Sequence, residues 1–253
     1  MVSRAWDQPG AWWPVRPGLV GGRDRLGGGT WMAMEGGRVA CVLNRPGSLG
    51  PAPGKRSRGE LPGLALAGTP IEAAHYRPFN LVLAGRDGAE FLCGDGLRLD
   101  RWALPQGVSM ITAHGPDDPA SPRVAAHRAA FLNEPEWPSW EPWLCTLCDR
   151  SGPAPVNVPP RNGFGTVCSS LVAWPTQGDP EWAFAPGPPD EIEFARVALP
   201  ESALGLAHLV DGGPAEFQQG QRGGGQVYDG GNEVFTGDHS VTKHAAGDER
   251  AQP

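Results

Sequence analysis

The sequence has no apolar run near the ~18 residues that a membrane-spanning helix needs. Its first residues, MVSRAWDQPGAWWPVRPG, also lack the apolar core of a secretory signal peptide. Its five cysteines are odd in number and scattered, which suits reduced thiols better than a disulfide framework. These absences predict a protein without a membrane span that works in the cytoplasm.

An excess of positive charge is missing as well. The 253 residues have a formal net charge of -7 and a pI near 5.4. Because nucleic-acid binding depends largely on a positive surface, we expect no nucleic-acid partner. An apolar content of 40% is adequate for one large domain or two small ones. The sequence shows no internal repeat and specifies no oligomeric state.

Glycine and proline are abundant, with 37 and 28 residues, and together make about a quarter of the chain. This fraction approaches that of segments without stable structure. Residues 201–253 contain QQGQRGGGQ, DGGN and GDER and few apolar residues. Burial of so few apolar groups cannot offset the entropy lost when a backbone is ordered. We therefore predict a domain over residues 1–200 and a Gly-rich, disordered tail over 201–253.

Turn residues and apolar runs predict two hairpins. A Gly-Gly turn divides residues 31–43, and an Asp-Gly turn separates 80–84 from 89–93. Ser121 as N-cap, followed by Pro122, opens a predicted helix that ends at Leu132. The other predicted elements are helices over 60–67 and 137–149 and strands over 108–113, 166–174, 182–184 and 191–197. Strands at both ends with helices between them fit the α+β class.

Residues 21–31, GGRDRLGGGTW, are the most distinctive part of the sequence. Glycines allow positive φ and close approach of the backbone, and the charged side chains between them are difficult to bury unpaired. We interpret this stretch, with residues 44–45 and 57–60, as loops that shape a pocket or a tight corner. Their polar groups form either a salt-bridge network or a pocket that recognises an anionic or carbonyl-bearing ligand through arginine. The candidate pocket residues are Arg23, Asp24, Thr30, Asn44, Arg45, Arg58, Glu60 and Asn80.

Three short motifs resemble known sites but have simpler explanations. Residues 50–56, GPAPGKR, have one residue too few between the glycines for a phosphate-binding loop, and an arginine where the magnesium ligand should stand. Residues 145–148 are a lone C-x-x-C in a predicted helix, where packing is favoured over zinc binding. His114 precedes two aspartates, but HGPDDPASP has the composition of a turn, and there is no G-x-S-x-G elbow. We predict no metal and no cofactor, and identify no catalytic residue.

Several motifs follow one another in an order that is more specific than any one of them. They are Gly22-Arg23-Asp24, Gly28-Gly29-Thr30-Trp31, Asn44-Arg45, Gly50-Pro51, Ser57-Arg58-Gly59-Glu60-Leu61, Arg77-Pro78-Phe79-Asn80-Leu81, Ser121-Pro122-Arg123 and Gly163-Phe164-Gly165-Thr166. From about residue 4 to residue 199 the chain resembles the NRDE family, the group that includes transport and Golgi organisation protein 2. The resemblance implies a scaffold like that of N-terminal-nucleophile (Ntn) hydrolases, a four-layer αββα sandwich with two mostly antiparallel sheets.

Members of that family typically start with Met-Cys, which implies a cysteine nucleophile whose own amino group is the base. They also carry an Asn-Arg-Asp-Glu tetrad at the end of an early strand. Neither feature is in this sequence, and residues 1–6 resemble the segment that follows the tetrad. We expect that the sequence begins at an internal methionine and lacks the first strand or strands of the fold. The chain as given is then expected to be inactive as a hydrolase.

Three functions stay open. The first is hydrolysis of linear amide bonds by a longer form of the protein, which the family scaffold implies. The second is a non-catalytic binding or trafficking protein, because the resemblance implies roles in Golgi organisation, secretion and the handling of lipid, acyl-coenzyme A or haem. His75 is the nearest candidate haem ligand, although a histidine at a helix end is commoner. The third is an interaction protein that uses the tail and the ten tryptophans. The first two predict a small-molecule substrate or ligand.

Overall fold

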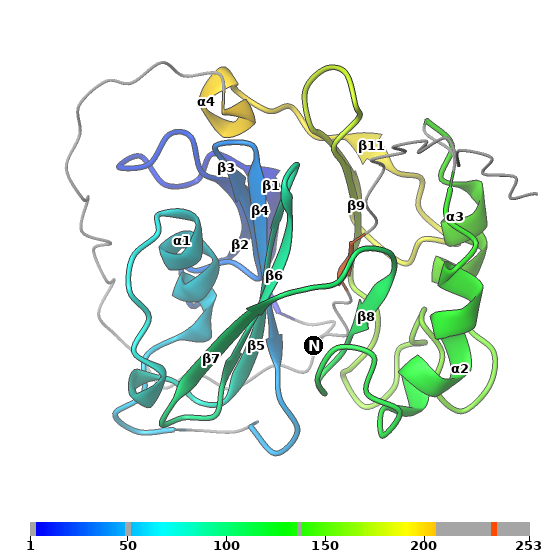
Figure 1. The fold of residues 1–253 in the computed structure, drawn as a ribbon, viewed down its shortest axis with the longest axis horizontal. Coiled ribbons are helices and arrows are strands. Elements are labelled where there is room, and N and C mark those ends of the chain that lie inside the picture. The colour runs from blue at the N-terminus through cyan, green and yellow to red at the C-terminus, as the bar shows by residue number, and fades with distance from the viewer. Residues whose placement is uncertain (1–3, 49–51, 136–137, 206–233, 237–253) are drawn as a thin grey trace, which may run out of the picture.

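Residues 4–48, 52–135, 138–205 and 234–236 are described in the structure, a computed structural model (Figure 1). Several features considered above lie outside the described residues. They are the start of the chain at 1–3, the first residues of the 50–56 motif, Trp137, and the predicted tail over 206–233 and 237–253. Within the described residues, no helix is long and apolar enough to cross a membrane.

Seven strands form one antiparallel sheet in which spatial order follows chain order. They are β1 (Trp6–Gly10), β2 (Val20–Asp24), β3 (Met32–Glu35), β4 (Arg38–Asn44), β5 (Phe79–Gly85), β6 (Gly88–Gly94) and β7 (Leu99–Ala103). Both predicted hairpins are confirmed. The β3–β4 turn places Gly36 and Gly37 at φ of 58° and 71°, where glycine is favoured. In the β5–β6 hairpin, Gly85 pairs with Gly88 across the turn.

Two smaller sheets and four helices complete the described fold. Strands β9 (Ser169–Ala173), β10 (Glu181–Ala185) and β11 (Ala195–Arg196) form one sheet, and β8 (Ser109–Ile111) pairs with β12 (Val234–Thr236). The helices are α1 (Leu61–Leu66), α2 (Pro122–Phe131), α3 (Glu141–Leu147) and α4 (Glu201–Leu204), and short 3-10 turns are η1 (Arg58–Glu60) and η2 (Ala73–His75). The predicted helices are confirmed within shorter bounds, as are the strands predicted over 108–113 and 166–174. The strand predicted over 182–184 is longer, at Glu181–Ala185, and only Ala195–Arg196 of the strand predicted over 191–197 forms.

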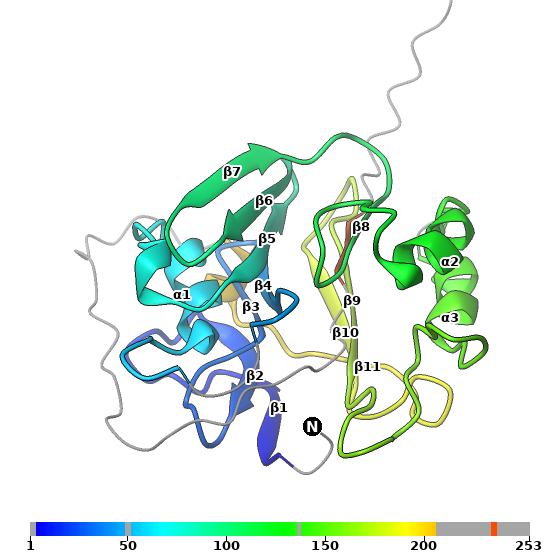
Figure 2. The same cartoon turned by 90° about the horizontal axis from the view of Figure 1, so that it is seen from below.

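The elements stack in layers, as Figure 1 and Figure 2 show. Helix α1 lies on one side of the seven-stranded sheet, the smaller sheets lie on the other, and α2 and α3 lie beyond them. An apolar cluster with Leu61 and Phe79 fills the space between α1 and the large sheet. A second cluster, with Trp182, joins the sheets, and a third, with Phe131 and Trp143, joins the smaller sheets to α2 and α3. The α+β class with antiparallel sheets is therefore confirmed.

The side chains of strand β5 alternate between the two apolar clusters on either side of the large sheet. Phe79, Leu81 and Leu83 face α1, whereas Val82 and Ala84 face the second layer. Successive side chains of a strand point to opposite faces of its sheet, so one buried strand contributes to both clusters. The same alternation places a polar residue, Asn80, among the residues that face the second layer.

Asn80 connects the two sheet layers through its side-chain amide. It is fully buried, and its Nδ2 donates to the carbonyl oxygens of Thr112 at 2.9 Å and His114 at 2.6 Å. Its Oδ1 accepts from Nη1 of Arg45 at 2.9 Å. These bonds hold the segment that follows β8 against the ends of β4 and β5.

The interpretation of residues 21–31 as a loop is wrong for their first part, which belongs to β2 and pairs with β1 and β3. A side chain on Gly22 would place Cβ 2.4 Å from the ring of Trp31, and one on Gly21 would place it 2.7 Å from the carbonyl oxygen of Met32. These glycines therefore serve close packing within a strand. The residues that follow Asp24 form a turn, which is closed by a 2.7 Å hydrogen bond from the amide of Gly28 to the carbonyl oxygen of Asp24.

Two described segments of residues 201–253 have regular structure. In α4, Ala203 is fully buried in the core between the sheets, and its carbonyl oxygen accepts from the amide of Gly37 at 2.8 Å. Strand β12 pairs antiparallel with β8, with Val234 opposite Ile111. Residues 201–205 thus pack on the β3–β4 turn of the large sheet.

Gly29 provides a test of close backbone packing. A Cβ at this position would lie 2.6 Å from backbone atoms of Gly59, beside the 2.7 Å hydrogen bond from Thr30 N to Gly59 O. We expect Gly29→Ala to lower the free energy of unfolding by about 2 kcal/mol, as overpacking of a tight site does. Gly115→Ala is the control, because its added methyl group meets nothing within 4 Å. Equal urea-unfolding midpoints for the two variants would show that the approach is not tight.

Asn80 provides a test of the link between layers. Asn80→Ala removes three hydrogen bonds and leaves two carbonyl groups and a guanidinium without these partners, so the free energy of unfolding should fall by about 3 kcal/mol. Asn44→Ala is a matched control on the neighbouring strand, since the Asn44 side chain makes no hydrogen bond to another described residue. It should change the free energy by less than about 0.5 kcal/mol in chemical denaturation. A similar loss in both variants would contradict the role of Asn80.

Candidate functional site

Arg23 and Asp24, the first predicted pocket residues, form ion pairs on β2. Arg23 donates from Nε to Oδ2 of Asp7 at 2.8 Å, and its guanidinium lies 4.7 Å from the ring centre of Trp12. The guanidinium groups of Arg25 and Arg23 hold the pKa of Asp7 below its usual range. Asp24 accepts from Nε of Arg4 at 2.7 Å and also from turn amides. This arrangement fits the salt-bridge interpretation of these residues.

The side chains of Thr30 and Glu60 are buried and are paired with other groups of the chain. Thr30 donates from Oγ1 to the carbonyl oxygen of Met32 at 2.7 Å and accepts from the amide of the same residue at 3.1 Å. Glu60 forms an ion pair with Arg56, with 2.7 Å between Nε and Oε1. Both side chains are therefore paired within the chain, and the 25–30 turn meets η1 through the backbone bond from Thr30 N to Gly59 O.

Arg58 holds the loop that leads from β4 to α1. Its Nη1 donates to the hydroxyl of Ser48 and to the carbonyl oxygen of Pro78, both at 2.7 Å. Burial, together with the nearby charge of Arg77, lowers the pKa of Arg58 to about 10. The bonds of Arg58 to neutral groups of this chain position the loop beside the start of β5.

Arg45 and Asn80 are the predicted residues that the structure brings together. Arg45 donates from Nη1 both to Oδ1 of Asn80 and, at 2.7 Å, to Sγ of Cys93. Asn44 ends β4 next to them. Through Asn80, this group reaches the carbonyl groups of Thr112 and His114, which belong to the wall of a cavity.

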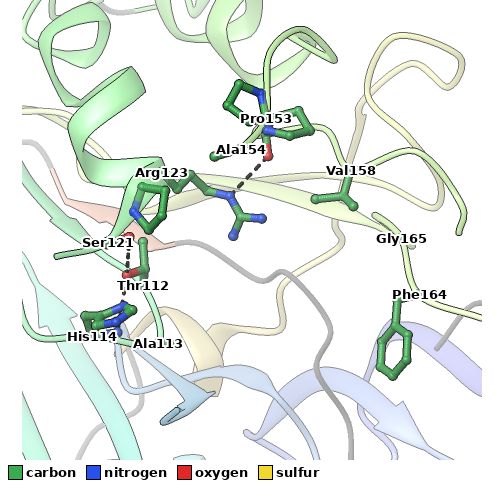
Figure 3. Close-up of a pocket in the computed structure, with 12 residues that line it drawn as sticks. Thr112, Ala113, His114, Ser121, Arg123, Pro153, Ala154, Val158, Phe164 and Gly165 are labelled. Atoms are coloured by element: carbon green, nitrogen blue, oxygen red, sulfur yellow. Dashed lines mark hydrogen bonds between the residues drawn. The ribbon is translucent and has the colours of Figure 1, made fainter. Parts of the chain in front are cut away.

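The cavity is open, has a volume of about 400 Å³, and is shown in Figure 3. Four short segments form its wall: the loop after β8, the start of α2, and two parts of the loop before β9. The lining residues are Thr112, Ala113, His114, Ser121, Pro122, Arg123, Pro153, Ala154, Pro155, Val158, Phe164 and Gly165. None of them belongs to the set of pocket residues predicted from the sequence.

Hydroxyl groups form the polar floor beside α2. Ser121 is the N-cap of this helix, and its Oγ accepts from the amide of Val124 at 3.4 Å. Its Oγ also lies 3.1 Å from Oγ1 of Thr112, which accepts from the amide of His114 at 3.3 Å. Both hydroxyl side chains are almost completely buried. The N-cap that was predicted from the sequence thus contributes to a cavity wall.

Arg123 brings a permanent positive charge to the lining. Its Nε donates to the carbonyl oxygen of Pro155 at 3.1 Å, so that its side chain bridges the start of α2 and the opposite loop (Figure 3). Among the described residues that line the cavity, none is an aspartate or a glutamate. The guanidinium thus adds hydrogen-bond donors to this part of the lining.

Phe164 reaches the cavity from a tight turn. Asn162 and Gly163 have φ of 52° and 79°, and backbone hydrogen bonds of 2.7 and 2.9 Å join Arg161 and Phe164 across the turn. Phe164 is 38% exposed, so part of this apolar side chain is accessible to solvent. This residue and Arg123 both occur in motifs that support the family resemblance, and that signal could have identified the cavity.

The remaining predicted motifs have structural roles. Trp143 and Leu147 of the C-x-x-C helix are buried against the smaller sheets, as the packing interpretation predicts. Asp117 pairs with Arg128, with 2.5 Å between Oδ1 and Nε, and accepts from the amide of Met110, so the segment after His114 forms a turn. The described residues hold no group of three or more His, Cys, Asp or Glu that is placed to bind a metal.

The cysteines and His75 do not form a reactive centre. All five cysteines are free, and Cys41 and Cys168 are buried. Burial raises the pKa of both thiols, that of Cys168 to about 12, so both are protonated at neutral pH. The side chain of His75 is 51% exposed and lies 3.3 Å from a carboxylate oxygen of Glu72. An axial haem ligand needs an apolar pocket, which this position does not provide.

Comparison with protein families gives a match to the first part of the chain. A family model described as Transport and Golgi organisation 2 matches residues 2–100, whereas no curated protein matches the chain. The matched residues include the predicted candidates on β2 and β4 together with Asn80, and the cavity-lining residues lie after them. The expected resemblance is thereby confirmed for the large sheet. Over residues 2–100, the chain is similar to the Transport and Golgi organisation 2 family.

Proposed function

We propose that this protein binds a small anionic or carbonyl-bearing molecule in the cavity of Figure 3. The observation that carries the proposal is the lining of the cavity, in which Arg123 and the hydroxyl groups of Thr112 and Ser121 lie beside apolar side chains. The planar guanidinium presents its donors in a fixed fork that matches carboxylate and carbonyl oxygens. A molecule with acceptor oxygens therefore suits the donors of this lining.

The size and composition of the cavity support a small organic ligand. Its volume of about 400 Å³ lies in the range of small-molecule sites, which is about 300 to 1,000 Å³. Prolines, Val158 and Phe164 supply apolar surface, while Arg123, His114 and the hydroxyl groups supply a few polar contacts. Such a mixture, mostly apolar with a small number of placed polar groups, is typical of ligand pockets.

We further propose that the scaffold is related to that of the Ntn hydrolases and that the protein works in the cytoplasm. The order of layers, α1, large sheet, smaller sheets and then α2 with α3, supports the scaffold (Figure 2). The five free cysteines support a reducing compartment. A role in trafficking through handling of such a ligand is compatible with the family to which residues 2–100 are similar.

Hydrolysis of linear amides is the second candidate, and the layer order is the observation that favours it. Nucleophilic catalysis needs a serine, threonine or cysteine within hydrogen-bond reach of a base. Among the described residues, no such side chain makes a hydrogen bond to a histidine ring, and the buried thiols are protonated. For the chain as given, binding is therefore preferred over catalysis.

The binding proposal predicts a ligand whose affinity depends on Arg123. In a panel of small carboxylates, phosphate monoesters and amides, at least one compound should bind by ligand-observed NMR and isothermal titration. Arg123→Gln should weaken that binding about tenfold or more, because a hydrogen bond to a charged group contributes about 1.5–3 kcal/mol.

Arg86→Gln is the matched control for the binding test. Arg86 also donates to backbone carbonyl groups, including that of Gly178 at 2.7 Å, but does not line the cavity. Its substitution should leave the affinity unchanged. The proposal fails if no compound of the panel binds, or if Arg123→Gln and Arg86→Gln have equal effects.

A chemical test separates binding from catalysis. The chain should not hydrolyse linear amide substrates, and iodoacetamide at neutral pH should modify the exposed Cys145 well before the buried Cys41 and Cys168, since burial raises the pKa of the last two. Mass spectrometry of the peptides gives the order of labelling. Turnover of an amide, or labelling of the amino terminus by an amide-based reactive probe, would favour the hydrolase instead.

A further inference from the structure

The outer side of β7 is a free edge of the large sheet within the described residues. The sheet runs from β1 to β7, and among the described strands β7 pairs with β6 alone (Figure 2). Alternate residues of an antiparallel strand direct their N–H and C=O groups to opposite sides. The amide of Leu104 donates to the carbonyl oxygen of Ala89 at 2.8 Å, so Trp102 also faces β6 with its backbone. Arg101 and Ala103 therefore direct their backbone groups away from the sheet.

The two edges of the large sheet differ in their protection against pairing. Strand β1 contains Pro9, which has no N–H, and its register with β2 shifts between Asp7 and Gly10. Prolines and bulges of this kind keep an edge from pairing with another strand. Strand β7 has no proline and pairs with β6 in unbroken register. The charge of Arg101 is balanced by Glu90 of β6 at 3.0 Å, so this edge is suited to accept a further strand.

A row of apolar side chains crosses the sheet and stops at this edge. Val82, Phe91 and Trp102 lie opposite one another on β5, β6 and β7. The ring centres of Phe91 and Trp102 are 5.0 Å apart. Val82 and Phe91 are almost completely buried, whereas Trp102 is 44% exposed. A strand outside β7 with an apolar residue opposite Trp102 extends this row and removes the exposed ring surface from water.

A second copy of β7 supplies such a residue. Two identical antiparallel strands are related by a two-fold axis, and the position of the axis determines which residues face each other. An axis at Asp100 or at Arg101 places like charges directly opposite, which destabilises a sheet. An axis at Trp102 places the two tryptophans opposite each other and Arg101 opposite Ala103. Cross-strand aromatic pairs stabilise a sheet, so the axis at Trp102 is favoured.

We propose that two copies of this chain pair through β7 in antiparallel orientation, with the two Trp102 side chains opposite each other. The two large sheets then form one continuous sheet. No residue of β7 lines the cavity, so this inference is independent of the proposed function. A stable interface uses about 20–30 residues a side, and a single short strand offers fewer, so the dimer is weak and depends on concentration.

Sedimentation equilibrium of the full chain at about 5 to 500 µM measures this dimer, because weak interfaces dissociate in that range. The average mass should rise from 26.7 kDa towards twice that value as the concentration increases. Arg101→Pro removes one outward N–H from each copy without removing a bond to β6. It should raise the dissociation constant by about tenfold or more, because two hydrogen bonds between the copies are lost.

Arg101→Ala is the matched control for the proline variant. It loses the same side chain and the same exposed pair with Glu90, but it keeps the outward N–H. It should change the dissociation constant by less than about threefold, since exposed ion pairs contribute little.

Cross-linking tests the register without a proline. Trp102→Cys places two thiols directly opposite each other, with about 4.5 Å between Cα atoms, which suits a disulfide. Asp100→Cys is the control, because in this register the two introduced thiols lie about four residues, or ~13 Å, apart along the strands. With oxidised glutathione at the highest protein concentration, only Trp102→Cys should give a dimer linked at the introduced thiol, as identified by peptide mass spectrometry.

Three results would count against the proposal. A mass that stays at 26.7 kDa over the whole series would overturn it and leave the edge for a strand of another protein. Equal dissociation constants for Arg101→Pro and Arg101→Ala would place the contact elsewhere on the molecule. Cross-linking of Asp100→Cys as readily as Trp102→Cys would contradict the register.

Discussion

The hydrogen bonds of Asn80 fix the cavity relative to the large sheet. Its amide lies in an otherwise apolar inner face of β5 and reaches two carbonyl groups in the segment after β8. A buried amide is costly unless its groups are paired, so this segment has one favourable position. Arg45 completes the arrangement by donating to Asn80 and to Cys93, which links the ends of β4, β5 and β6 to the same point.

The contacts of Asn80 also determine the position of the cavity wall. The loop that Asn80 holds carries Thr112, whose hydroxyl meets the N-cap of α2, and α2 in turn positions Arg123. Arg123 reaches across to the loop before β9 through the carbonyl group of Pro155. The hydrogen bonds of Asn80 and of the Thr112–Ser121 pair thus connect a buried amide on β5 to the part of the cavity wall that carries Arg123.

The sequence predicted the elements that are determined by residues close together in the chain. The Gly-Gly and Asp-Gly turns define the two hairpins, and Ser121-Pro122 defines the start of α2, because turn and cap residues act within a few positions. Strand β2 could not be predicted in this way, since its glycines are required by tertiary packing: Gly22 lies against the ring of Trp31 and Gly21 against the backbone of Met32. Strand β7 was missed because it is an exposed edge whose side chains show no clear apolar alternation.

The candidate site was harder to predict than the fold. Arg23, Asp24 and Glu60 carry the charge expected of a pocket but form ion pairs with nearby residues, and spacing alone does not separate the two uses. The cavity arises where residues around 112, 122, 155 and 164 meet, and no sequence period links them. The sequence did identify Asn80 and Arg45 as candidates. Their hydrogen bonds support the cavity wall, and this role becomes visible only when the two sheet layers are packed together.

The central claim is that the cavity lined by Thr112 and Phe164 binds a small anionic or carbonyl-bearing molecule, for which benzoate is a probe. Intermolecular nuclear Overhauser effects between benzoate and the isotope-labelled chain test it most directly. The account predicts contacts from the benzoate ring protons to the Phe164 ring and the Thr112 methyl group, since both residues line the cavity. Contacts confined to residues outside the cavity, such as those around α1, would contradict it.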